Sequence, residues 1–133
     1  MSRLLGKVAA SVGAVALLCA TAVGTASASV ADDPGGTRVP AGQVDATGVT
    51  TDIQPVVWEQ DGGRTLAVVA EEGGCVRVSG RLSKQTATEV DFQVVSVVVK
   101  HVVCPQFVRN VWVTVHLDAP LGDRTVVLST VNQ

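Results

Sequence analysis

Aromatic and basic residues are scarce in this chain of 133 residues, which has two tryptophans, two phenylalanines, no tyrosine and 10 lysines and arginines. Four aromatic side chains are a poor supply for a carbohydrate-binding platform. The basic residues form no lysine- or arginine-rich run, whereas nucleic acids and anionic lipids attract clustered positive charge. The composition therefore argues against nucleic acid and anionic lipid as partners.

Recognisable catalytic and metal-binding motifs are missing as well. The two histidines, His101 and His116, belong to no H-x-H or H-x-x-x-H spacing, and the chain has no C-x-x-C pair. His116 and Asp118 would share one face of a strand, and we interpret them as exposed strand residues rather than as metal ligands. No G-x-S-x-G nucleophile motif occurs, and no glycine-rich loop precedes a helical pattern. We therefore expect a protein that is not an enzyme and that uses no cofactor or metal.

The first 28 residues have the three parts of a secretory signal peptide. Arg3 and Lys7 give a basic start, residues 8–23 are apolar, and residues 26–28 read A-S-A, a typical cleavage site. Cleavage removes two of the 10 basic residues and none of the 12 acidic ones, so the net charge changes from −2 to −4. The apolar run is short and rich in alanine and glycine for a membrane span, and an uncleaved anchor is the alternative. Lipid attachment at Cys19 is disfavoured because the larger Leu18 precedes it.

Two cysteines, Cys75 and Cys104, remain after cleavage in a compartment that permits disulfides. A bridge between them closes a loop of about 28 residues and contributes roughly 3–4 kcal/mol by reducing the entropy of the unfolded chain. Two free thiols or an intermolecular pair are the alternatives. We predict the intramolecular disulfide.

Two parts are expected in the mature chain. Residues 29–51 are rich in glycine, proline, aspartate and threonine, which predicts a flexible arm. Residues 52–133 are valine-rich and cut by glycine pairs, which predicts a β domain. The expected strands are residues 56–60, 65–70, 75–84, 89–99, 111–117 and 125–128. In the second half of the strand 89–99 valines occupy both faces, so we expect cover on both sides there.

The fold class predicted from this pattern is all-β, a small antiparallel sandwich or partial barrel of about six strands in a meander. Its register raises a problem for the disulfide. A turn at residues 86–87 would place Cys75 opposite Val98, about 20 Å from Cys104 if the chain stays extended. A disulfide needs Cα atoms about 5.5–6 Å apart. We therefore predict that the strand breaks at residues 100–101 and that the chain doubles back.

Trp112, Thr114 and His116 lie in line on the outward face of the strand 111–117. An exposed tryptophan flanked by hydrogen-bonding groups would stack on a sugar or grip a partner protein. The alternative, which we favour, is that the arm or a second sheet covers Trp112. Trp58 has the same two interpretations.

Residues 102–107 read V-V-C-P-Q-F and combine a disulfide cysteine with a proline. A loop stiffened in this way loses little entropy on binding, as a substrate-like inhibitor loop requires. The Cys-Pro step resembles that of the subtilisin-inhibitor family of secreted actinobacterial proteins, and the resemblance implies a protease inhibitor acting through residues 104–107. The chain departs from that family in having one bridge instead of two, and Gln106 where the specificity residue is typically Met or Lys. The alternative is a connecting loop whose proline ends the ladder.

Residues 113–126 read V-T-V-H-L-D-A-P-L-G-D-R-T-V. They resemble a motif, V-x-L-x-x-P-L-G-D-R-x-V, of small exported or lipid-anchored actinobacterial proteins of unknown function. These proteins also tend to carry a glycine-flanked cysteine and a second cysteine before the motif, so the resemblance reaches from residue 73 to 127. It implies no activity. The chain departs from the group because no lipid-attachment cysteine is in place.

The motif also has a structural interpretation. Pro120 fixes φ within a turn, and Gly122 supplies freedom at its fourth position. Asp118 or Asp123 is expected to pair with Arg124. We interpret the motif as a tight hairpin turn that sets the register of the strands 111–117 and 125–128, rather than as a ligand loop.

These observations favour an exported, non-enzymatic domain, secreted or associated with the cell wall, that acts by contact with a protein or an envelope component. The alternative function is a secreted protease inhibitor that presents residues 104–107.

Overall fold

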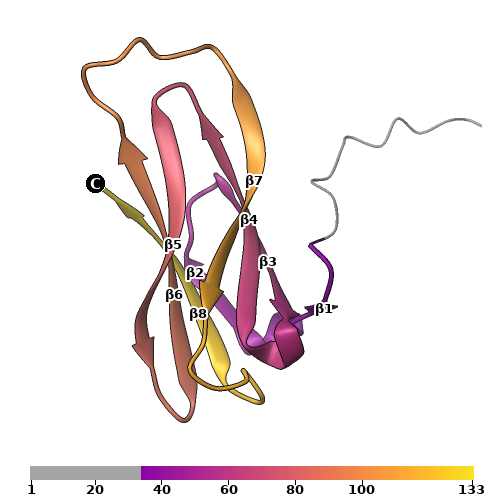
Figure 1. The fold of residues 1–133 in the computed structure, drawn as a ribbon. Coiled ribbons are helices and arrows are strands. Elements are labelled where there is room, and N and C mark those ends of the chain that lie inside the picture. Colours follow the sequence, from indigo (N-terminus) through magenta and orange to yellow (C-terminus); the bar gives the residue numbers. More distant parts are fainter. Residues whose placement is uncertain (1–33) are drawn as a thin grey trace, which may run out of the picture.

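The computed structural model describes residues 34–133, so the predicted signal peptide lies outside the described residues. It contains eight strands and two short 3-10 turns (Figure 1). The strands are β1 (Thr37–Arg38), β2 (Val44–Gly48), β3 (Ile53–Gln60), β4 (Thr65–Gly73), β5 (Val76–Gln85), β6 (Glu89–Val98), β7 (Val108–His116) and β8 (Thr125–Asn132). The turns are η1 (Ala41–Gln43) and η2 (Asp61–Gly63). The predicted all-β class is confirmed, and all six expected strands are present.

All eight strands belong to one curled, mixed sheet that forms a half-barrel (Figure 1). One wing has the strand order β1-β3-β4-β7, and the other has the order β5-β6-β8-β2. The wings are joined at the β4–β5 turn, where Gly73 pairs with Val76. This arrangement places the β6–β7 connection at one end of the half-barrel and the β5–β6 turn at the other.

Apolar side chains fill the space between the wings. β-branched and aromatic residues suit the pleated sheet, and alternation sends every second one inward. Val90, Phe92 and Val94 of β6 are almost fully buried, as their period of two predicts. They pack in one cluster with residues of the other strands, among them Leu66, Val68, Val113, Val115, Val126 and Leu128.

The predicted hairpin between the last two strands is wrong. β7 pairs with β4, and β8 instead lies between β6 and β2, parallel to both. The two parallel pairs also differ from the antiparallel meander expected for the whole chain. β7 and β8 do not form a hairpin because the connection between them, residues 117–124, crosses the end of the half-barrel. Leu117 and Leu121 of this connection are buried there. The backbone N–H of Leu121 donates to the carbonyl oxygen of Gly63 at 2.8 Å.

The expected flexible arm, residues 29–51, is part of the sheet where the structure describes it. β1 pairs with β3, and β2 pairs with β8. Val39 is buried and belongs to the core cluster. The expectation of flexibility is therefore wrong over residues 37–48, because the partner strands that order this polar stretch are far away in the sequence.

Gly80 lies where β5 passes close to β7. An added Cβ atom would stand 2.6 Å from the carbonyl oxygen of Thr114, which is too close for any side chain. The close backbone approach that an interior glycine indicates is thus present. Gly80 itself is regularly paired with Val94, and the register of β5 against β6 shifts between Leu82 and Lys84.

The second half of β6 is only partly covered. Val95 is buried, whereas Val97, Val98 and Val99 are exposed, so the predicted cover on both sides is wrong for these three valines. The physical reason is that β8 ends at Asn132, opposite Ser96, and β6 continues beyond it. The valines after this point have β5 as a neighbour on one edge.

Candidate functional site

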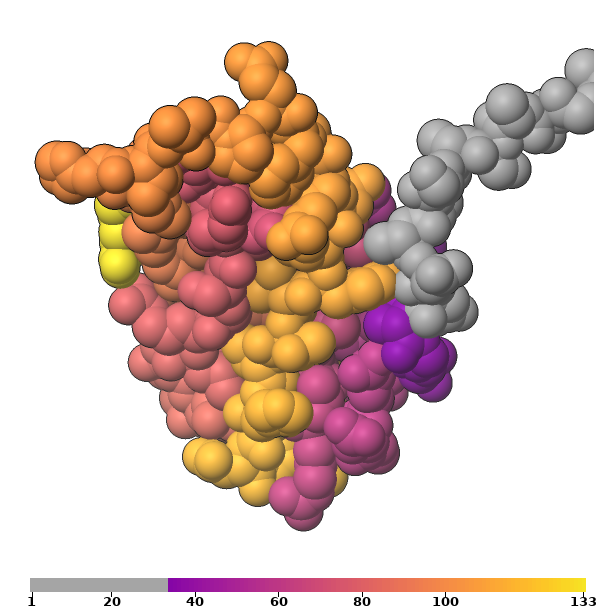
Figure 2. Space-filling view, turned by 45° about the horizontal axis from the view of Figure 1, so that its top comes forward, coloured from indigo at the N-terminus to yellow at the C-terminus, as the bar shows by residue number. Residues whose placement is uncertain are grey.

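Six exposed valines lie in or beside the β6–β7 connection. This connection forms one end of the half-barrel and is the orange loop at the top of Figure 1. They are Val97, Val98, Val99, Val102, Val103 and Val108, with exposed fractions between 37% and 94%. We call residues 97–108 the tip. In Figure 2 the orange atoms of this part of the chain project from the body.

The base of the tip is fixed by the disulfide between Cys75 and Cys104, whose Cα atoms are 4.9 Å apart. The prediction of this bridge is confirmed. The N–H of Val99 donates to the carbonyl oxygen of Cys75 at 2.8 Å, and the N–H of Gly74 donates to that of Phe107 at 3.0 Å. Both strands of the tip are therefore tied to the β4–β5 turn.

The chain reverses where the sequence predicts a break. β6 ends at Val98, and His101 has a φ of 63°, in the left-handed region that few residues other than glycine adopt. This reversal brings Cys104 back to Cys75. The pairing of β5 with β6 is shifted by one residue from the expected register, because Val76 and not Cys75 lies opposite Val98.

Phe107 lies at the foot of the tip, close to two guanidinium groups. The Cζ atoms of Arg77 and Arg109 are each 5.4 Å from the centre of its ring, a cation–π distance. Arg109 donates Nε to Oε1 of the buried Glu72 at 2.8 Å, and its Nη2 contacts the same oxygen. These hydrogen bonds hold the pKa of the Glu72 carboxyl below its usual value. The foot of the tip is thus a compact network of four side chains.

The tip is chemically suited to apolar contact. Its side chains are mainly aliphatic, and no acidic residue occurs between Asp91 and Asp118. Among residues 34–133, no group of three or more His, Cys, Asp or Glu side chains could hold a metal ion. Aliphatic side chains held by a disulfide offer buried area on binding and lose little entropy.

The second candidate surface is the outward face of β7. Thr114 and His116 are exposed, and Trp112 is half-buried. Thr114 pairs with Ala67 of β4, His116 with Thr65, and Trp112 with Val69. The three side chains therefore share one face of the sheet. Within residues 34–133, no second sheet or arm buries Trp112 completely.

His116 takes part in a short hydrogen-bond chain. The Thr65 hydroxyl donates to Oδ2 of Asp61 at 2.7 Å and lies 3.0 Å from Nδ1 of His116. Since the single hydroxyl proton is used on the carboxylate, Nδ1–H of His116 is the donor to Thr65, and in the neutral imidazole Nε2 is then an acceptor. Asp118, which sequence placed beside His116, is hydrogen-bonded to Gln85 instead. Nothing in the spacing of these residues along the chain indicates this arrangement.

The P-L-G-D-R motif is organised by Arg124. Its Nη2 donates to the carbonyl oxygens of Ala119 and Pro120, both at 2.8 Å, and its Nε donates to that of Leu121 at 3.1 Å. The predicted ion pair with Asp118 or Asp123 is therefore wrong, because the guanidinium binds backbone carbonyls. Gly122 has a φ of 56°, the left-handed conformation that favours glycine.

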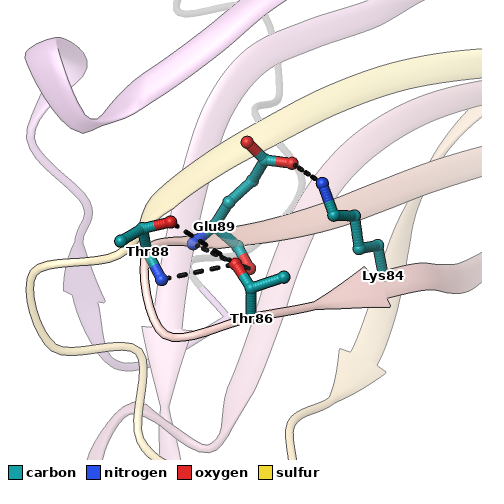
Figure 3. A network of polar contacts seen from close by, with 4 residues as sticks. All are labelled: Lys84, Thr86, Thr88 and Glu89. Carbon is teal, nitrogen blue, oxygen red and sulfur yellow. Dashed lines mark hydrogen bonds and ion pairs between the residues drawn. The ribbon is translucent and has the colours of Figure 1, made fainter.

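A shallow hollow separates this loop from the β5–β6 turn and is lined by residues of both. The turn is fixed by the network in Figure 3, in which Oγ1 of Thr86 accepts from the N–H groups of Thr88 and Glu89. Lys84 pairs with Glu89 at 2.8 Å. Arg124 and the hydroxyl of Thr86 are thus engaged within the protein, which favours a structural role for the motif arginine.

Comparison with protein-family models, with curated proteins and with solved structures finds no match for the chain. In the part of the chain that the structure describes, no helix is long and apolar enough to cross a membrane. The disulfide is typical of an oxidising compartment.

Proposed function

We propose that this protein is an exported, non-enzymatic binding domain that contacts a partner protein, outside the cell or in its envelope, through the tip. The observation that carries the proposal is the 94% exposure of Val103 in a loop anchored by a disulfide at the next residue. Exposed apolar side chains gathered in one place on a monomeric protein often mark a contact surface.

The energetics support a contact of this kind. Complete burial of a valine side chain contributes roughly 1.5 kcal/mol, so a few valines of the tip supply a useful share of a micromolar affinity. The ordering of the loop is already achieved by the disulfide and by the contacts of Phe107, which lowers the entropic cost of association. Export is supported by the signal-like first 28 residues and by the disulfide.

The test is site-specific photo-crosslinking in the producing cell. A photoreactive residue is placed at position 103, and at position 87 in the turn at the other end of the half-barrel as a control. We expect a discrete product from position 103 alone. The partner is then purified and titrated, and Val103→Ser should raise its Kd about tenfold, while Ala87→Ser leaves it unchanged. Equal crosslinking from both positions, or an unaltered Kd for Val103→Ser, refutes the proposal.

A second candidate function, a secreted protease inhibitor, is favoured by the same exposed and anchored loop. Cys104, Pro105 and Gln106 are exposed, so a protease could reach the backbone of residues 104–107. A panel of secreted serine proteases tests it. Inhibition at micromolar protein that is lost in a Val103→Ser or Gln106→Ala variant would support this function, and no inhibition across the panel would remove it.

We also propose kinship with the small exported actinobacterial proteins that residues 113–126 resemble. The role of Arg124 supplies a physical criterion for it. A structure of one of those proteins should show the motif arginine donating to the three carbonyls before the motif glycine. A motif arginine paired with an aspartate would count against the kinship.

A further inference from the structure

The two tryptophans of the chain lie on the same outer face of one wing. Trp58 of β3 pairs with Ala67 of β4, and Trp112 of β7 pairs with Val69 of β4. Residues paired directly across an antiparallel ladder point to the same side of the sheet. The core side of β4 carries the alternate residues Leu66, Val68 and Ala70. Residues 58 and 112, which are 54 positions apart, thus flank β4 on its outer side.

The burial of β4 shows that side chains cover this face. Ala67 is 0% exposed and Val69 is 5% exposed, although neither belongs to the core cluster. The neighbours on the same face include both indoles, and each indole is half-buried. Both tryptophans are thus partly covered and partly accessible to solvent. Two strand spacings and two residues along the strand separate the tryptophan Cα atoms by ~12 Å.

Polar groups that suit hydroxylated ligands lie on the same face. Thr114 is exposed opposite Ala67, in the row of Trp58. His116 presents Nε2 as an acceptor because Thr65 engages Nδ1. Exposed Gln54 pairs with Val69, in the row of Trp112.

The charge of the face also limits its ligand. The rows that hold the two tryptophans carry no ionised side chain on β3, β4 or β7. Arg38 of β1 pairs with Trp58 and places a cation at the margin of the face. An uncharged ligand therefore matches the centre of the face.

We infer that this surface, the tryptophan face (Trp58, Trp112, Thr114 and His116), binds a neutral polysaccharide chain. The chain has few aromatic residues for a carbohydrate-binding platform, but the fold brings two of the four onto one face. Indole rings stack on the apolar C–H faces of pyranose sugars, while their hydroxyl groups need donors and acceptors at the edge. The distance between the tryptophans spans roughly two pyranose rings of an extended chain. This inference goes beyond the proposed function and uses different residues, so the domain would hold an envelope glycan with one surface and a protein with the tip.

The protein's own fluorescence tests the inference. Because the chain has two tryptophans and no tyrosine, its emission comes from this face alone. The purified protein is titrated with soluble β-1,4-linked oligomers of glucose and of N-acetylglucosamine. A saturable change in emission with at least one oligomer is expected, with a Kd of about 0.1–1 mM.

Variants decide whether the face is responsible. Trp112→Leu and Trp58→Leu keep an apolar cover over β4 but remove the stacking ring, and each should weaken binding about tenfold, with the remaining tryptophan as the reporter. Thr114→Val leaves the exposed surface folded and should weaken binding about threefold. Val103→Ser, in the tip, should bind the sugar as the wild type does, so failure of the tip proposal is seen separately.

Three results would overturn the inference. One is the lack of a saturable change with either oligomer series. Another is unchanged sugar affinity in both Trp112→Leu and Thr114→Val. The third is sedimentation of the wild type as a dimer that Trp112→Leu dissociates, because a second copy and not a sugar would then occupy the face.

Discussion

Arg109 donates both Nε and Nη2 to one oxygen of Glu72 and thereby ties the start of β7 to the end of β4 beneath the tip. The side chain of Glu72 is 7% exposed, while that of Arg109 is 61% exposed. The pair is therefore open to solvent on one side only. Its contribution depends on pH because the pKa of Glu72 is lowered in the folded protein.

The first prediction concerns this pH dependence. A carboxyl group whose pKa is lowered on folding adds stability above its unfolded pKa, and this stability is lost as pH falls through the folded pKa. The Tm of the wild type should therefore decrease below about pH 4.5. Glu72→Gln should be less stable by about 1 kcal/mol at pH 7 and should show a weaker acid dependence.

Thermal unfolding of both proteins between pH 3 and 7 measures this effect. Lys84→Ala, which removes the more exposed pair with Glu89, serves as the control and should leave the Tm at pH 7 unchanged. Parallel curves for the wild type and Glu72→Gln would contradict the prediction.

The second prediction concerns the disulfide. A Cys75→Ser, Cys104→Ser double variant should lose about 3 kcal/mol of stability, which corresponds to a Tm lower by roughly 10–20 °C. Mass spectrometry of the wild type with and without reductant should show the gain of two hydrogens per molecule. The tip should become more mobile, so hydrogen exchange at residues 99–107 should accelerate more than in β4. Unchanged exchange there would mean that Phe107 and its partners hold the tip without the bridge.

The third prediction concerns the contact between β5 and β7. Gly80→Ala should destabilise the domain by about 2 kcal/mol, because the new methyl group collides with the carbonyl of Thr114. Gly42→Ala is the matched control, since nothing lies within 4 Å of a Cβ added there. Chemical denaturation compares the two variants. Equal stability of the two would show that β5 is not held against β7 in solution.

The fourth prediction concerns the loop at residues 117–124. Arg124→Lys should cost about 2 kcal/mol, because an ammonium group cannot reach the three carbonyls that the planar guanidinium bridges. Arg81→Lys is the control, as Arg81 is exposed and donates to the single oxygen Oε1 of Gln93. A loss in Arg124→Lys no greater than that in Arg81→Lys would argue against the clamp.

The strands could be predicted because their signals are local. Alternating valines and glycine pairs mark where a strand begins and ends, and the inward residues Val90, Phe92 and Val94 follow from the period of two alone. The disulfide could be predicted because two cysteines remain in a chain whose first residues predict export. The break near His101 followed from the distance that the disulfide had to close.

The partners of the strands could not be predicted in the same way. β2 pairs with β8, about 80 residues later, and no local pattern in its polar sequence indicates this. The sequence around Pro120 correctly predicted that Gly122 adopts a conformation that favours glycine. It does not reveal that Leu121 is buried at the end of the half-barrel. Trp112, Thr114 and His116 could be placed on one face from their spacing, but Trp58 could not be added to them, since β4 alone brings Trp58 and Trp112 together.

The place of β8 between β6 and β2 also has a kinetic consequence. The wing that contains these strands cannot be assembled until residues 125–132 are free to pair, however early β2 and β6 appear. Such a high contact order slows folding, so the chain stays unfolded for longer after its synthesis. In a protein exported as we propose, the sheet would close only after the chain has crossed the membrane.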